Sequence, residues 1–199
     1  RNSDYTIREY ICNFIMSKLE TNTIDTISGT TNLTIGSTNS STVTFENGAV
    51  TGHMYPAFMV GLSANQTSIT AGSYTKATFD EEDVDTDSAF ASNKFTVPSG
   101  KAGKYFIGLE VQMNAESGAG TAQVGSVRIY KNGSAAINGG IVDFRNTNGQ
   151  KFNANVSAIM NLSAGDYLEG YAELHTSSGN VTFVASNRST KFFGYRIGA

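Results

Sequence analysis

Residues 93–114 read NKFTVPSGKAGKYFIGLEVQMN, and this stretch is the most informative for the fold. It contains two strand candidates, 93–97 and 104–114, with β-branched and aromatic residues that pack well on a pleated surface. The turn signal Pro98-Ser99-Gly100 separates them. We expect the apolar side chains of the longer strand to point into a core, namely Phe106, Leu109 and Val111.

The same alternation of strand and turn signals continues on both sides of this stretch. Asn132-Gly133 and Asn148-Gly149 favour tight hairpins, because both central residues of such turns can take positive φ. Strands spaced by about ten residues, without helical segments between them, indicate a β-sandwich or jelly roll. The further strand candidates are 57–63, 74–80, 122–131, 140–144, 151–161, 166–175, 179–186 and 190–197.

Five groups of residues, in this order along the chain, carry a resemblance to a known family. They are Tyr55–Phe58 with Gly61–Ser63, Phe95–Pro98 with Gly103–Phe106, Val127–Gly133, Leu162–Leu168 and Phe192–Ile197. On these motifs, residues 55–199 resemble the jelly roll of the complement component one-q and tumour-necrosis-factor family. The resemblance implies an all-β head that forms a tight homotrimer around a three-fold axis. Gly194, between two aromatic residues, predicts the close approach of another backbone or side chain.

The segment before the head departs from the animal members of that family. It has no collagen-like Gly-X-Y repeat, and ten of residues 21–52 are Thr. Leu33, Ile35, Val43 and Phe45 form short alternating units that cannot bury a core within one chain. Three chains wound together could place them on a common axis, as in the intertwined stalks that this segment resembles in bacteriophage fibres. The alternative is a flexible Ser/Thr linker.

The first residues of the chain predict a short helix over 4–20. Ile7, Ile11, Phe14 and Ile15 fall on one face at helical spacing, and this face needs a partner. The partner is either a neighbouring copy, another virion protein or the chain's own head, and a strand is a second interpretation. The expected domains are thus an N-terminal helix or attachment segment (1–20), a β-stalk (21–54) and a jelly-roll head (55–199). Within the head, Tyr167, Tyr171 and Tyr195 are expected to join the trimer core.

Composition excludes several classes of function. The net charge is −3 and no basic patch is present, so nucleic-acid binding lacks its electrostatic basis. No apolar run approaches the roughly 20 residues of a membrane helix. Cys12 is the only cysteine, so a disulfide within one chain is impossible. Catalysis needs a constellation of groups, and neither His53 nor His175 belongs to one; we therefore predict no catalytic residues and no enzyme.

Two groups of polar residues are candidates for binding. Asp80, Glu82, Asp83 and Asp85 belong to an acidic run whose carboxylates could hold Ca²⁺, and the alternative is a solvated acidic loop. Apart from this calcium, no cofactor is expected. Loops on a rigid scaffold are where binding usually resides. The candidate ligand-binding residues on such loops are Asn114, Glu116, Arg145, Asn146 and Asn148.

These features predict a homotrimeric virion appendage, a bacteriophage fibre whose head attaches to a glycan or protein on the host surface. Its first segment would bind other virion proteins, and the protein would be extracellular on the fibre, tail or capsid surface. Two alternatives remain at this point. One is a capsid or tail decoration or assembly protein, and the other is a fibre-borne polysaccharide depolymerase.

Overall fold

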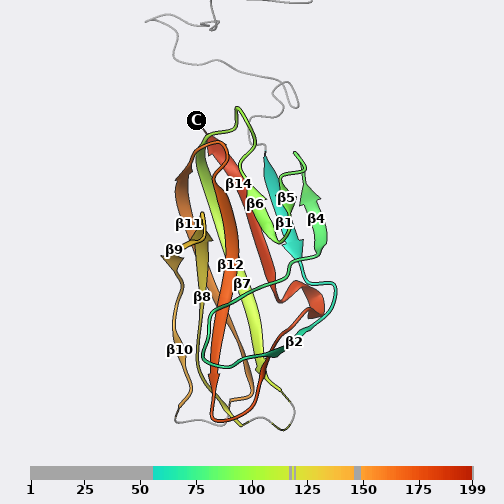
Figure 1. Cartoon of the computed structure of the whole chain (residues 1–199), viewed down its shortest axis with the longest axis vertical. Helices are drawn as coiled ribbons and strands as arrows, with labels where there is room; N and C mark the ends of the chain where they lie inside the picture. The colour runs from blue at the N-terminus through green and yellow to red at the C-terminus, as the bar shows by residue number, and fades with distance from the viewer. Residues whose placement is uncertain (1–55, 117, 119, 146–148, 199) are drawn as a thin grey trace, which may run out of the picture. The chain divides into compact units, whose positions relative to one another are not determined.

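The computed structural model describes residues 56–116, 118, 120–145 and 149–198, which form two antiparallel β-sheets packed face to face (Figure 1). The predicted helix and stalk lie outside the described residues. In sheet A the order is β2 (Gln66–Ile69), β13 (Val181–Phe183), β7 (Gly103–Ala115), β14 (Lys191–Gly198), β1 (Ala57–Gly61) and β4 (Glu81–Asp85), with β11 (Lys151–Leu162) on the free side of β7. In sheet B it is β10 (Val142–Asp143), β8 (Ala122–Lys131), β12 (Tyr167–Thr176), β6 (Lys94–Thr96) and β5 (Phe90–Ala91), with β9 (Ser134–Asn138) on β8 and β3 (Thr75–Lys76) on β12.

The all-β jelly-roll prediction for the head is therefore confirmed. The strand expected over 74–80 is shorter than predicted and contains only β3. The acidic run that follows is strand β4, where the sequence had suggested a solvated loop. This strand pairs with β1, so the backbone hydrogen bonds of the sheet hold the acidic residues in an extended conformation.

The core lies between the two sheets and follows the two-residue period of the strands. On β7, Tyr105, Ile107, Leu109 and Val111 are buried in alternation, as expected for Leu109 and Val111. Phe106 was expected in the core as well, and this prediction is wrong. Phe106 lies between the buried residues Tyr105 and Ile107. Successive side chains of a strand point to opposite faces, so Phe106 points to the outer side of the sheet.

Stacked aromatic rings fill the centre of the sandwich. The ring of Phe58 lies 4.4 Å from that of Phe95 in the opposite sheet and 5.1 Å from that of Phe192. Gly194 faces this cluster. A β-carbon there would lie 2.5 Å from Ile107 Cδ1, 2.8 Å from the Phe106 carbonyl oxygen and 2.9 Å from a ring carbon of Phe58. The close approach predicted at Gly194 is thus confirmed.

Two of the sequence motifs meet at one end of sheet B, where each contributes a turn. The side-chain amide of Asn132 donates to Asp166 at 2.8 Å, and the backbone N–H of Tyr167 donates to Asn132 Oδ1 at 2.9 Å. Lys131 Nζ lies 2.8 Å from Asp166, and the backbone N–H of Ser163 donates to the same carboxylate. Lys131, Asn132 and Ser163 together lower the pKa of Asp166 to about 2. The residues of these two motifs therefore serve to hold the two turns together.

The described part of the chain begins and ends at the same end of the sandwich. The backbone N–H of Arg196 donates to the carbonyl of Pro56 at 3.0 Å, and Gly198 pairs with Lys104 at the start of β7. The last residues of β7 lie about 40 Å away, at a rise of about 3.3 Å per residue. We call the end that contains Ala115 and Glu116 the distal end (lower end of Figure 1).

Candidate functional site

The outer surface of sheet A carries an apolar row that crosses four neighbouring strands. Ile159 of β11 pairs with Phe106 of β7. Tyr195 of β14 pairs with Phe106 on one side and with Ala57 of β1 on the other. Paired residues of antiparallel strands point to the same side of a sheet, so the four side chains lie next to one another. The exposed fraction is 66% for Ile159 and 37% for Tyr195.

A second apolar row lies next to the first. Phe193 of β14 pairs with Gly108 of β7 and with Met59 of β1, which pairs in turn with Val84 of β4. The Phe193 ring covers Gly108, where a β-carbon would lie 2.3 Å from a ring carbon. We call the seven side chains of the two rows the apolar face: Ile159, Phe106, Tyr195, Ala57, Phe193, Met59 and Val84.

Polar residues border the apolar face along the strands. On the distal side, Lys191 Nζ lies 2.5 Å from Glu110, and the side-chain amide of Asn153 donates to the same carboxylate. On the other side, Lys104 pairs with Asn161, and both are exposed. An apolar centre with a polar rim is the usual anatomy of a protein–protein interface. The apolar face can therefore bury itself against another protein surface.

The three tyrosines predicted for the trimer core do not share one face. Tyr167 and Tyr171 alternate with buried Leu168 and Ala172 on β12, so they point outward from sheet B. Tyr195 points outward from sheet A, on the opposite side of the sandwich. Tyr195 alone of the three belongs to the apolar face, and the role of all three in a trimer core stays a prediction. Alternation along a strand shows which residues are outward, but it does not show which sheet contains the strand.

The outer surface of sheet B is polar where that of sheet A is apolar. The Tyr171 ring stacks on Tyr130 at 4.0 Å, and Lys94 Nζ lies 4.7 Å from the centre of the Tyr167 ring. The Arg128 guanidinium lies 3.7 Å from the centre of the Tyr74 ring. Two of the aromatic rings on this surface thus lie beside lysine and arginine side chains, whereas those of the apolar face lie beside one another.

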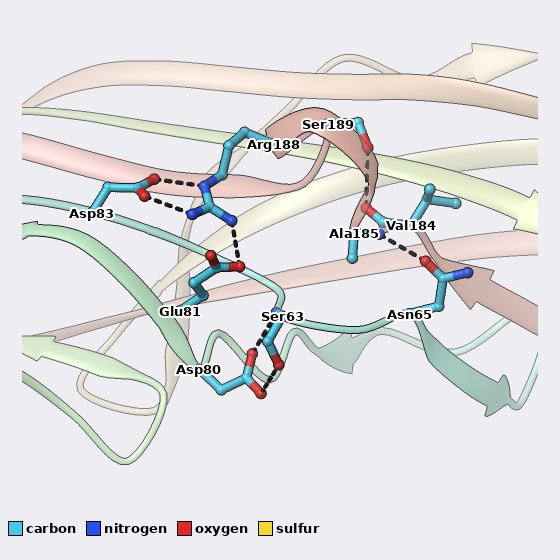
Figure 2. Close-up of polar contacts among 9 residues, drawn as sticks. All are labelled: Ser63, Asn65, Asp80, Glu81, Asp83, Val184, Ala185, Arg188 and Ser189. Carbon is cyan, nitrogen blue, oxygen red and sulfur yellow. Dashed lines mark hydrogen bonds and ion pairs between the residues drawn. The ribbon is translucent and has the colours of Figure 1, made fainter.

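Arg188 holds the acidic strand β4 in place (Figure 2). It follows the 3-10 turn residue Asn187, and both residues have left-handed φ values. The Arg188 guanidinium donates to both oxygens of Asp83 at 2.6 Å and to Glu81 at 2.5 Å. These hydrogen bonds lower the pKa of each carboxyl. Arg188 also packs over Gly61 of β1, so it connects the loop after β13 to β4 across the outer surface of sheet A.

The calcium site predicted from the acidic run does not fit this arrangement. Asp80 accepts two hydrogen bonds from Ser63, as Figure 2 shows, and Asp85 accepts the backbone N–H groups of Ala89 and Phe90. Asp83 is bound by Arg188. Within the described ranges, no group of three or more His, Cys, Asp or Glu side chains could hold a metal ion. Three of the four predicted calcium ligands, Asp80, Asp83 and Asp85, are thus bound by hydrogen-bond donors of the protein itself, and Glu82 is exposed.

Replacing Arg188 with methionine is expected to lower the melting temperature by a few degrees at neutral pH and to leave it nearly unchanged in strong acid. The folded pKa values of Glu81 and Asp83 are lowered. Their contribution to stability is therefore complete above the ordinary values of 4.5 and 3.8 and is lost as the pH falls through the folded values. Thermal unfolding of both proteins over a pH series measures this difference.

Lys151→Met is the matched control for this experiment, because Lys151 is exposed on β11 and forms no ion pair within the described part of the chain. Its melting temperature should differ from that of the wild type by the same amount at every pH. A constant difference for Arg188→Met as well would show that Arg188 acts by packing alone.

A polar pocket of about 400 Å³ lies at the distal end, where β2, β7 and β13 meet. Two of the predicted ligand-binding residues, Asn114 and Glu116, contribute to its wall. Arg145 does not line it and instead forms an ion pair with Asp143. Asn146 and Asn148 lie outside the described residues, as do the stalk residues Leu33, Ile35, Val43 and Phe45. The described residues that line it are Asn65, Thr67, Ser68, Asn114, Ala115, Glu116 and Thr182.

The comparisons with known proteins agree with this architecture. Murine APRIL superposes with a TM-score of 0.52 at 8% sequence identity, over 73% of this chain and 100% of that chain. Eiger TNF from S. frugiperda gives a TM-score of 0.51 at 10% identity, over 72% and 93%. The globular domain of zebrafish complement 1qA gives 0.47 at 14% identity, over 71% and 97%. No protein-family model and no curated protein matches the sequence.

At these identities the comparisons show the fold alone, which is the TNF-like jelly roll. The resemblance inferred from the sequence motifs is thereby confirmed for the fold of the head. The described residues contain no helix with the length and hydropathy that a membrane crossing requires.

Proposed function

We propose that the protein is a homotrimeric attachment protein of a virion, in which three jelly-roll heads associate through the apolar face of sheet A. The observation that carries the proposal is the apolar face itself. Two of its side chains, Ile159 and Val84, are 66% and 42% exposed in the single chain, next to a ring cluster of Phe106, Phe193 and Tyr195. A contiguous apolar patch of this kind marks an interaction site.

Three arguments favour identical copies over a different partner. The motif resemblance implies a trimer around a three-fold axis. The apolar pairs expected over residues 21–54 also need two further copies to be buried. In addition, the polar rim contains both signs of charge, with Lys191 beside Glu110 and Lys104 beyond the first apolar row. An interface that is obligate typically buries more than about 2,000 Å² in total, and the face crosses five strands of sheet A.

A trimer would strengthen attachment to a surface because it offers several binding sites at once. Three heads on one axis present three copies of the distal loops, and linked binding sites can raise avidity by about 10²–10⁴ without any new contact. The hydrogen bonds between these loops support a rigid platform. Ala115 donates to Gln150, Glu116 to Asn180 and Gly120 to Ser178, each at 2.9–3.0 Å. We propose binding without catalysis as the role of this platform.

The full chain is expected to have a mass in solution of about three times 21.1 kDa by light scattering. The purified trimer should also block adsorption of the virus that carries it to its host cells, in proportion to the trimer added. A mass of 21.1 kDa would contradict the trimer. A trimer without any effect on adsorption would instead favour a decoration or assembly protein that contacts only other virion proteins.

A further inference from the structure

The distal pocket has the chemistry of a saccharide site. We propose that it binds a neutral saccharide through paired hydroxyl groups, with Glu116 and Asn114 as the acceptors that orient it. This inference rests on the proposed attachment function and names the ligand class of the distal end. The pocket volume of about 400 Å³ lies within the roughly 300–1,000 Å³ of small-molecule sites.

The protein holds the Glu116 carboxylate in place before any ligand arrives. Its Oε1 atom accepts the backbone N–H of Ser68 and the hydroxyl of Thr182. The backbone N–H of Glu116 donates to the backbone carbonyl of Asn180. Ser68 has a left-handed φ of 58°, which is uncommon for a residue other than glycine, and this conformation accompanies its contact with Glu116. Oε2 of Glu116 has no hydrogen bond within the described part of the chain and is available to a ligand.

The amide oxygen of Asn114 is buried and has no hydrogen-bond partner among the residues that the structure describes. A buried acceptor without a donor is costly, and such groups are rare in native proteins. Asn114 pairs with Thr182 in the sheet, and both are next to Glu116. A hydroxyl group in the pocket would supply the missing donor once the Asn114 side chain rotates to bring this oxygen to the pocket wall. The unsatisfied oxygen thus favours a ligand rich in hydroxyl groups.

The rest of the lining provides donors and further hydroxyl groups. Asn65 accepts the backbone N–H of Ala185 through Oδ1, which leaves its amide N–H groups for a ligand. Thr67 and Ser68 add hydroxyls that both donate and accept. A sugar hydroxyl also donates and accepts, so it complements this mixture better than a group that only accepts.

The charge of the pocket lining favours neutral ligands over anionic ones. Among the described residues, the lining contains a carboxylate and no Lys or Arg. A phosphate, sulfate or sialic acid carboxylate would face Glu116 without a compensating cation. A neutral saccharide avoids this repulsion, and an organic cation is the class that the experiment must exclude.

Glu116→Gln is the sharpest variant, because the glutamine oxygen can still accept the hydrogen bonds from Ser68 and Thr182. The substitution replaces only Oε2, the acceptor that is available to a ligand, with an amide group that donates. Binding of the full chain to an array of immobilised oligosaccharides, both neutral and sialylated or sulfated, should identify at least one neutral ligand. We expect Glu116→Gln to weaken that binding at least tenfold, with an unchanged melting temperature. Glu82→Gln, an exposed carboxylate of β4, is the matched control and should bind like the wild type.

A second variant separates a binding role of Asn114 from a structural one. Asn114→Leu removes the unsatisfied oxygen, so the protein should be as stable as the wild type or more stable, while saccharide binding is lost. Full binding by either variant would overturn the proposal. So would an array on which only anionic saccharides bind, or none, or a wild type that binds tetramethylammonium at this pocket in place of sugars.

Failure of this inference differs from failure of the proposed function. A trimer that blocks adsorption equally well with Glu116→Gln keeps the attachment function and removes the pocket from it. A chain that is monomeric in solution, yet loses binding of the free soluble sugar on Glu116→Gln, keeps the pocket and removes the trimer. Affinity for the soluble sugar is expected to depend on one chain, because one chain supplies all of the described lining residues.

Discussion

Replacing Ile159 with aspartate is expected to convert the proposed trimer into single chains of 21.1 kDa. Ile159 is 66% exposed on β11, so the substitution leaves the core of the head intact. In a trimer formed through the apolar face, each copy would instead bury a carboxylate against apolar neighbours. An ionised group buried without a partner strongly opposes association. Light scattering at matched chain concentrations, with circular dichroism to show that the fold is retained, measures this result.

Ile141→Asp is the matched control, since Ile141 is an isoleucine with 74% exposure that lies outside the apolar face, just before β10 of sheet B. It should keep the mass of the wild type. If both variants remain trimeric, the apolar face is not the interface. If both dissociate, surface charge in general is responsible, and the assignment to sheet A is wrong.

Replacing Gly194 with alanine is expected to destabilise the head by about 1–3 kcal/mol, the usual cost of overpacking a core. The added methyl group would meet the Phe106 carbonyl oxygen at 2.8 Å, and backbone cannot move aside as a flexible side chain can. Ile107 and Phe58 would crowd it as well. Urea unfolding gives the free-energy difference, provided that the chain concentration is fixed, because trimer stability depends on it.

Gly140→Ala provides the comparison, because no atom lies within 4 Å of a β-carbon at Gly140. We expect this variant to unfold at the same urea concentration as the wild type, or at a slightly higher one. Equal stability of the Gly194 and Gly140 variants would mean that the sandwich relaxes around the added methyl group, and that Gly194 is not required for packing.

The fold of the head could be predicted from the sequence because its signals are local. Turn pairs such as Asn132-Gly133, and motifs such as the one around Asp166, define strand ends without any knowledge of the partner strands. Gly194 could be interpreted in the same way, from its aromatic neighbours alone. Phe106 was misassigned on its apolar character alone. The expected inward residues Leu109 and Val111 already place position 106 on the other side of β7, because successive side chains of a strand alternate between its two faces.

The candidate sites depend on contacts between distant segments, which the sequence does not show. Tyr171 and Tyr195 are both outward, but they belong to different sheets. Glu81 and Asp83 have their partner Arg188 more than 100 residues away, so the acidic run resembled a metal site. Asn114 and Glu116 were predicted as binding residues on a loop after a long strand.

The remaining pocket residues, from β2 and β13, were missed. They are Asn65, Thr67, Ser68 and Thr182, which lie in short polar segments of ordinary composition.

The hydrogen bond between Arg196 and Pro56 has a practical consequence for protein engineering. A fluorescent protein or an affinity tag joined behind the last strand would emerge beside Pro56, some 40 Å from the tip that carries the pocket, at about 3.3 Å of rise per residue of β7. Labelled versions of the molecule should therefore leave the pocket at the tip unobstructed. The loops at the tip can be exchanged while the base of the sandwich stays unaltered.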